Sequence, residues 1–151
     1  MIIEALFSVA IQTTPWRLES VRDGMNDSLS VFVSTEVDGE TLAIGCLEGQ
    51  LLVTRISSEV LGRGSRRDEP AFRFPGVEAS RSRWTYTMNA AHLYARDADT
   101  FTRGMAASDS VLTRLITYRG ETIDRHFATE GSVEGVDAVR VACRLPSLTP
   151  D

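Results

Sequence analysis

The sequence predicts a mainly β fold of the α+β type, an antiparallel β-sandwich or barrel with one or two short helices packed on it. Several short segments alternate apolar and polar residues with the period of two that is typical of strands. Pairs such as Asp38-Gly39 and Arg119-Gly120 separate these segments and favour tight hairpin turns. Helical spacing of apolar residues is found only late in the chain, over 97–107 and after Ser132. Many strands with few helices are typical of antiparallel sheets rather than of alternating βαβ units.

The first half of the chain predicts a hairpin that leads into a three-stranded antiparallel meander. Residues 16–21 indicate a short strand, and the turn-rich residues 23–27 follow it. The pairs Asp38-Gly39 and Glu48-Gly49 supply the two tight turns that a meander needs. The strands of the meander are expected at 29–34, 41–47 and 50–56, the last of them a buried central strand because it is rich in β-branched and aliphatic residues.

The second half predicts further strands, one loop and two helices. Gly62–Pro70 is polar and carries charges of both signs, so we expect an exposed loop. Phe72–Phe74 and Trp84–Met88 alternate at period two and are expected to pair with each other across Pro75-Gly76. The remaining elements are a helix over 97–107, a hairpin of 111–118 with 121–127, and a helix that Ser132 caps, with Val133, Val136, Val139 and Cys143 near one face.

A chain of 151 residues is the size of one ordinary domain, and we expect 16–145 to form it, with 146–151 as a tail. Residues 1–15 are apolar as far as Ile11 but have no basic start. They are expected either as the remnant of a trimmed leader or as a first strand. The compartment is periplasmic if a leader was trimmed and otherwise cytoplasmic.

The composition disfavours two classes of partner. A net charge of −5 discourages binding to phosphate backbones, so nucleic acid is not expected as a partner. No segment approaches the roughly 18 consecutive apolar residues of a membrane span.

No catalytic or metal-binding pattern is recognisable. We expect His92 in a surface turn and His126 on a strand, and neither has the spacing of a metal ligand. The sequence has no G-x-S-x-G motif, and Gly62-Arg63-Gly64 lacks the third glycine of a phosphate-binding loop. We therefore predict no catalytic residue, no metal and no cofactor, and a chain that is not an enzyme. A catalytic triad assembled only by the fold is the weaker alternative.

Cys46 and Cys143 lie nearly the whole chain apart, so they can meet only through the fold. If they are bridged, the closed loop restricts the unfolded chain by up to about 4–5 kcal/mol on the entropic model. A bridge would also indicate an oxidising compartment, whereas two reduced cysteines would favour the cytoplasm.

Taken together, these landmarks resemble the TagO-like accessory proteins that are associated with bacterial type VI secretion. The resemblance runs from about Trp16 to Cys143. Its landmarks are Trp16 at the start of the first strand, the turn Asn26-Asp27-Ser28, the strand Leu42-Ala43-Ile44-Gly45-Cys46 followed by Leu51-Leu52-Val53, the aromatic strand from Trp84, a short helix with Phe101, the strand from Leu112 to Tyr118 before Arg119, and a terminal helix ending in Cys143.

The resemblance implies a non-enzymatic accessory domain that is exported to the cell envelope and carries a bridge between Cys46 and Cys143. We also expect their Cα atoms within bridging distance because each ends a strongly apolar segment and the last helix needs an anchor to the sheet. A different class is the alternative: a phage or mobile-element encoded inhibitor or minor structural protein that acts by protein–protein binding. An unrecognised hydrolase is a third and weaker hypothesis.

We expect a protein partner to contact surface loops or an exposed strand edge. The best candidates in a loop are Arg63, Arg66 and Arg67, because the loop contains glycine and arginine offers donor forks suited to carboxylates. The alternative is a solvated loop with no partner. The sequence leaves the oligomeric state open.

Overall fold

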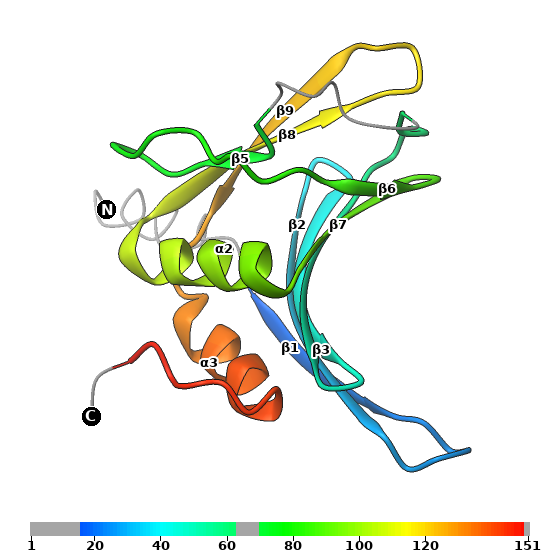
Figure 1. The fold of residues 1–151 in the computed structure, drawn as a ribbon, viewed down its shortest axis with the longest axis vertical. Helices are drawn as coiled ribbons and strands as arrows, with labels where there is room; N and C mark the ends of the chain where they lie inside the picture. The colour runs from blue at the N-terminus through cyan, green and yellow to red at the C-terminus, as the bar shows by residue number, and fades with distance from the viewer. Residues whose placement is uncertain (1–15, 63–69, 150–151) are drawn as a thin grey trace, which may run out of the picture.

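The computed structural model describes residues 16–62 and 70–149, which form a mainly antiparallel β fold with two helices (Figure 1). In chain order the elements are β1 Arg17–Arg22, β2 Leu29–Val37, β3 Glu40–Leu47, β4 Gln50–Ile56, β5 Phe72–Arg73, β6 Thr85–Thr87, β7 Ala90–Tyr94, α2 Ala95–Ala107, β8 Ser110–Ile116, β9 Thr122–Ala128 and α3 Val133–Ala142. The predicted fold class is confirmed in its sandwich-like form, because the described strands make two sheets and neither closes into a barrel.

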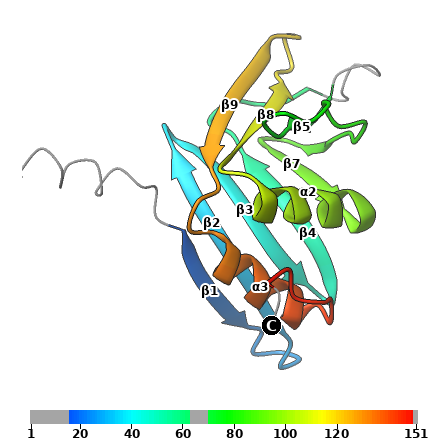
Figure 2. The same ribbon diagram turned by 90° about the vertical axis from the view of Figure 1, so that its left-hand side faces the viewer.

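The sheets and helices share one core. The larger sheet has the strand order β1-β2-β3-β4-β7-β6, and the smaller has the order β5-β8-β9. Figures 1 and 2 show α2 and α3 against one face of the larger sheet, with the smaller sheet over the far end of that same inner face. The core between these layers includes Leu42, Ile44, Val53, Phe101 and Phe127, which are fully buried. No other described element covers the opposite face of the larger sheet, which we call the outer face.

Two tight turns connect the meander of β2, β3 and β4, as predicted. Asp38 and Gly39 have φ values of 51° and 80°, and Glu48 and Gly49 have 53° and 79°. Two successive residues with positive φ are typical of the type I′ turn, whose twist matches that of the flanking strands. The register of the meander therefore follows from local backbone chemistry.

The predicted pairing of Phe72–Phe74 with Trp84–Met88 is wrong. β5 pairs with β8 in the smaller sheet, whereas β6 pairs with β7 in the larger one. Phe72 and Phe74 lie 4.8 and 5.6 Å from the ring of Phe101 on α2, so aromatic packing in the core draws β5 away from β6. A turn at Met88-Asn89 returns the chain as β7, a strand that the sequence analysis did not predict.

Two smaller predictions also need correction. Ser132 does occupy the position before α3, but its hydroxyl donates to the Thr129 carbonyl oxygen at 2.6 Å and caps no helix N–H. Ser132 is fully buried in a helical conformation, so its hydroxyl takes the nearest acceptor, one turn back. His92 lies on β7 rather than in a surface turn, whereas His126 lies on a strand as expected.

The two helices are tied to the sheet and to each other. Cys46 near the end of β3 is joined to Cys143 after α3 by a disulfide, with 5.5 Å between the Cα atoms, so the expected proximity is present. The buried Arg140 of α3 donates to Asp99 at 2.6 Å and to Thr102 at 2.9 Å, both on α2. These contacts fix the helical layer over the inner face.

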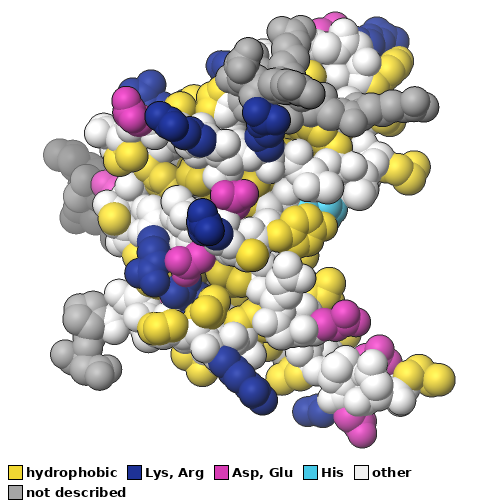
Figure 3. Space-filling view, viewed as in Figure 1, with side chains coloured by type: hydrophobic (Ala, Val, Ile, Leu, Met, Phe, Trp, Pro, Cys, Tyr) yellow, Lys and Arg dark blue, Asp and Glu magenta, His cyan; other side chains and the backbone are white. Residues whose placement is uncertain are grey.

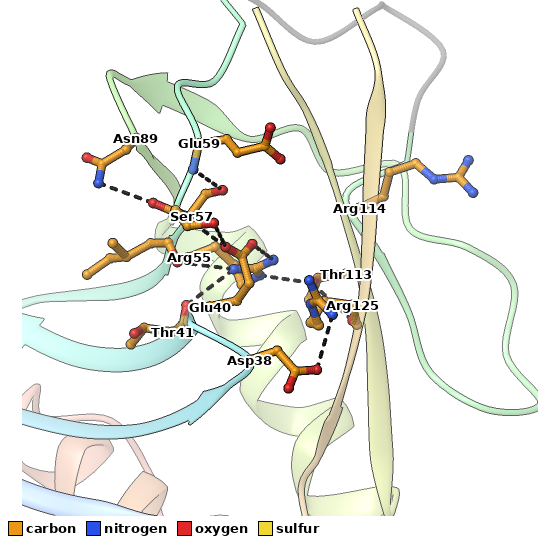
Figure 4. A network of polar contacts seen from close by, with 12 residues as sticks. Asp38, Glu40, Thr41, Arg55, Ser57, Glu59, Asn89, Thr113, Arg114 and Arg125 are labelled. Atoms are coloured by element: carbon orange, nitrogen blue, oxygen red, sulfur yellow. Dashed lines mark hydrogen bonds and ion pairs between the residues drawn. The ribbon is translucent and has the colours of Figure 1, made fainter.

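A buried ion pair of the larger sheet contacts the smaller sheet through its arginine (Figure 4). The Arg55 guanidinium contacts Glu40 at 3.1 Å, donates to the Thr113 hydroxyl of β8 at 2.9 Å and lies 5.0 Å from the Phe127 ring centroid of β9. The second carboxylate oxygen of Glu40 accepts the Ser58 N–H at 2.7 Å. Burial alone would raise the pKa of Glu40, but the hydrogen bonds from Ser58 and Arg55 and the charge of Arg55 hold it below its ordinary value of 4.5.

Removal of the disulfide tests how far it constrains the chain. The variant Cys46→Ser/Cys143→Ser should lose up to about 4–5 kcal/mol of unfolding free energy, because the bridge closes a loop between residues 97 apart. Urea unfolding of the oxidised protein and of the variant measures the difference, and reduced wild type is the control that should match the variant. A loss below about 1 kcal/mol would contradict the entropic account.

Glu40→Gln tests the ion pair. We expect it to lower the free energy of unfolding by about 3–5 kcal/mol, because it leaves the Arg55 charge buried without a counter-charge. Glu36→Gln on the exposed side of β2 is the matched control and should change stability by less than about 0.5 kcal/mol.

The same pair of proteins should differ in pH dependence. The depressed pKa of Glu40 means that its contribution is present above pH 4.5 and is lost as the pH falls through the folded-state pKa. Urea titrations across this range should therefore show the gap between wild type and Glu40→Gln shrinking in acid. A gap that does not change with pH would argue against an ionised Glu40.

Candidate functional site

The structure brings together only some of the residues that the sequence analysis singled out. Cys46 and Cys143 meet in the disulfide. The three loop arginines, Arg63, Arg66 and Arg67, lie outside the described residues, so their role stays a prediction. Within the described residues no group of three or more His, Cys, Asp and Glu side chains could hold a metal ion. Neither described helix has the length and apolar character needed to cross a bilayer.

The outer face of the larger sheet is not covered by any other described element. Strand alternation sends Val33 and Thr35 of β2 into the core, so Phe32, Ser34 and Glu36 point outward. In Figure 3, which has the orientation of Figure 1, the molecule is hollowed on this side, between the β6–β7 hairpin above and the β1–β2 hairpin below. The outer face is therefore concave.

Register sorts the outer side chains into rows that run across the strands. The first row is Phe32, Gly45, Leu52 and Tyr94. The second is Ser34, Ala43, Thr54, His92 and Thr85. The third is Glu36, Thr41, Ile56, Ala90 and Thr87. An apolar row thus lies beside a row of short or uncharged polar side chains that includes His92.

Charged side chains are missing from most of this face. None of the outward residues of β3, β4, β6 and β7 is Asp, Glu or Arg, although a quarter of the chain is charged. These outward residues are Thr41, Ala43, Gly45, Leu47, Gln50, Leu52, Thr54, Ile56, Thr85, Thr87, Ala90, His92 and Tyr94. The charges of the face lie at its β1–β2 side, on Arg17, Glu19 and Glu36. Depletion of charge in the centre with charge at the rim is typical of protein interfaces.

An aromatic ring lies flat on the sheet at Gly45. A Cβ built on Gly45 would lie 2.5 Å from Cδ1 and 2.8 Å from Cε1 of Phe32, so the ring occupies the space that a side chain would need. In the same row Leu52 is half-buried and Tyr94 is 41% exposed. The first row therefore presents a continuous apolar surface to any docking molecule.

His92 is held by hydroxyl groups on both sides. Its Nδ1 lies 3.0 Å from the Thr54 hydroxyl and its Nε2 lies 3.0 Å from the Thr87 hydroxyl. Burial lowers the pKa of His92, which favours the neutral ring. Both ring nitrogens thus face threonine hydroxyls, whereas the histidine of a catalytic triad faces a carboxylate. The contacts link β4, β7 and β6 across the outer face.

Two recesses accompany the sheets. One of about 270 Å³ lies at the charged rim of the outer face and is lined by Arg17, Glu19, Ser34, Thr35, Glu36 and Thr41. The other, of about 290 Å³, lies on the smaller sheet and is lined by Arg73, Phe74, Pro75, Gly76, Ser110, Leu112 and His126. Both are at the small end of the size range of ligand sites.

The sequence predicts partner contacts on loops and strand edges and makes no separate prediction for the outer face. A signal was present, because the outward positions of 41–56 are uncharged as well as alternating. Uncharged outward positions indicate a candidate binding surface only when the strands are known to be neighbours and one face of the sheet is known to be uncovered. No protein family, curated protein or solved structure matches this chain.

Gly45→Ala tests the close contact between the Phe32 ring and the backbone at Gly45. The added methyl group must displace the ring, so we expect a loss of about 1–2 kcal/mol of unfolding free energy. A double-mutant cycle with Phe32→Ala measures the coupling in urea unfolding, and Gly45→Ala should cost little once the ring is absent. Gly24→Ala, where a Cβ meets no atom within 4 Å, is the control. Equal costs with and without the ring would contradict the contact.

Proposed function

We propose that this chain is a non-enzymatic accessory domain that binds a protein partner on the concave outer face of its larger sheet. The partner that fits is a convex protein surface of low charge with exposed aliphatic or aromatic side chains. Its centre would contact the row of Phe32, Leu52 and Tyr94, and its polar margin would meet Arg17 and Glu36 at the rim.

The charge-free centre of the outer face is the observation that supports this proposal. Burying a charged side chain without a counter-charge is costly, whereas apolar and hydroxyl groups lose water cheaply. The outer face of the smaller sheet is different, because it carries an Arg114–Asp124 ion pair at 2.7 Å together with Arg73 and His126. Of the two sheets, the larger one therefore has the surface better suited to desolvation.

The disulfide supports a place of action outside the reducing cytoplasm. Disulfides persist in oxidising compartments and are rare in the cytosol. The bridge between Cys46 and Cys143 is thus in keeping with the exported accessory proteins that the sequence resembles. We propose an envelope location on this basis, and with it a role in an envelope assembly such as a secretion system.

Site-specific photo-crosslinking tests the binding face. A photoreactive phenylalanine analogue placed at Tyr94, in cells that naturally make the protein, should yield one discrete adduct with another protein. The matched control is Tyr118 on the β8–β9 hairpin, which is 62% exposed and should yield none. Leu52→Asp should abolish the Tyr94 adduct because it places a charge in the apolar row, whereas Leu112→Asp, a half-buried leucine of the smaller sheet, should leave it unchanged.

Other outcomes would overturn the proposal. Equal adducts at Tyr94 and Tyr118 would indicate collisions without a site. An adduct that survives Leu52→Asp would move the contact elsewhere, and the loop with Arg63, Arg66 and Arg67 would be the next candidate. Turnover of a hydrolase substrate panel by the wild-type protein would contradict the non-enzymatic assignment.

A further inference from the structure

β1 is an unusually exposed edge strand. All six of its residues are exposed, and within the described part of the chain β2 is its only strand partner. Leu18 and Val21, on opposite faces of the strand, are 53% and 56% exposed. Figures 1 and 2 show β1 at the rim of the larger sheet, while α3 packs on β2 and β3.

Such an edge is a template for another strand. Its outer side presents N–H and C=O groups that no strand among the described residues engages, and proteins commonly block these edges with proline, lysine or a bulge. β1 contains no proline, lysine or bulge, because its residues are Arg-Leu-Glu-Ser-Val-Arg and its register to β2 is unbroken from Arg17 to Arg22. Its charged residues, Arg17, Glu19 and Arg22, select against a strand that does not complement them. The strand is therefore suited to edge-to-edge pairing.

We propose that β1 pairs antiparallel with β1 of a second copy of this chain, across a two-fold axis perpendicular to the sheet. In the register we assign, Leu18 lies opposite Leu18 of the second copy. Arg17 then lies opposite Glu19 of the second copy, and Glu19 opposite Arg17, because antiparallel partners on either side of the centre are exchanged by the symmetry.

Charge complementarity selects this register. Arg17 and Glu19 both point to the outer face, and neither has an ion-pair partner within the described residues. The pairing gives two symmetric cross-strand ion pairs on one face and a leucine pair on the other, and both kinds of pair stabilise sheets. Of the two neighbouring registers with matching faces, one places Glu19 against Glu19 and the other Arg17 against Arg17, and both are repulsive. A register centred on Ser20 forms no ion pair between the two β1 strands, because it places Val21 opposite Glu19 and Arg22 opposite Leu18. A slip by one residue would place outward side chains opposite inward ones.

The pairing would extend the larger sheet through the dimer. The two outer faces would lie on the same side, because the two-fold axis is perpendicular to the sheet. In this register only Arg17, Leu18 and Glu19 of the two β1 strands lie opposite each other, so the contact is short. It should bury less than the roughly 1,200–2,000 Å² of a standard interface and should dissociate on dilution. It does not depend on the binding function proposed for the outer face.

Sedimentation velocity of the full chain over a range of concentrations tests the dimer. Wild type should show a reversible monomer–dimer equilibrium. Arg17→Glu and Glu19→Arg should each raise the dissociation constant by about tenfold or more, because each turns two attractive pairs into repulsive ones. The charge swap Arg17→Glu/Glu19→Arg should return it close to the wild-type value, because the two ion pairs form again with reversed signs.

Glu36→Arg is the matched control, since it reverses an outer-face charge on β2, one strand in from the edge, and should leave the dissociation constant unchanged. A wild-type protein that stays monomeric at every concentration would overturn the proposal. A dimer that both single variants leave intact, or that the charge swap fails to restore, would overturn it as well.

Discussion

The buried contact between Arg55 and Glu40 constrains how the layers of this fold are stacked. Both side chains point to the inner face of the larger sheet, and a charge there is tolerated only when its hydrogen bonds are satisfied inside the protein. Thr113 of β8 and Ser58 complete the set, and Phe127 of β9 lies against the guanidinium. The smaller sheet is therefore held over this end of the inner face, because a shift would remove the contacts of Thr113 and Phe127 with Arg55 and expose the Arg55–Glu40 pair to water.

The rest of the inner face is closed by a second group of specific contacts. The disulfide holds the end of α3 against β3, and Arg140 joins α3 to Asp99 and Thr102 of α2. Gly104 of α2 lets Phe74 approach so closely that a Cβ there would lie 2.2 Å from the ring. These directional contacts all lie on one side of the larger sheet. Its other side carries the His92 links between strands but no contact with another described element.

This one-sided construction explains why the proposed functions lie on the outer face and at the β1 edge. Neither surface holds the layers together, so a partner can occupy it without disturbing the core. The concave row of Phe32, Leu52 and Tyr94 provides apolar area, and the edge provides main-chain groups with the charges of Arg17 and Glu19 beside them. The two surfaces meet at the β1–β2 hairpin, so a strand added at the edge would also lengthen the face.

What the sequence by itself determined were the features with local causes. The turn at Asp38-Gly39 needs positive φ at both residues. The spacing of apolar residues in α2 and in β2 to β4 predicts which side of each element is buried. Only the tertiary structure decided that β5 and β6 belong to different sheets, because pairing depends on partners distant in sequence, here Phe72 and Phe74 packing on Phe101. It likewise decided that one face of the larger sheet is bare, since an uncharged outward residue has the same local pattern whether a layer covers it or not.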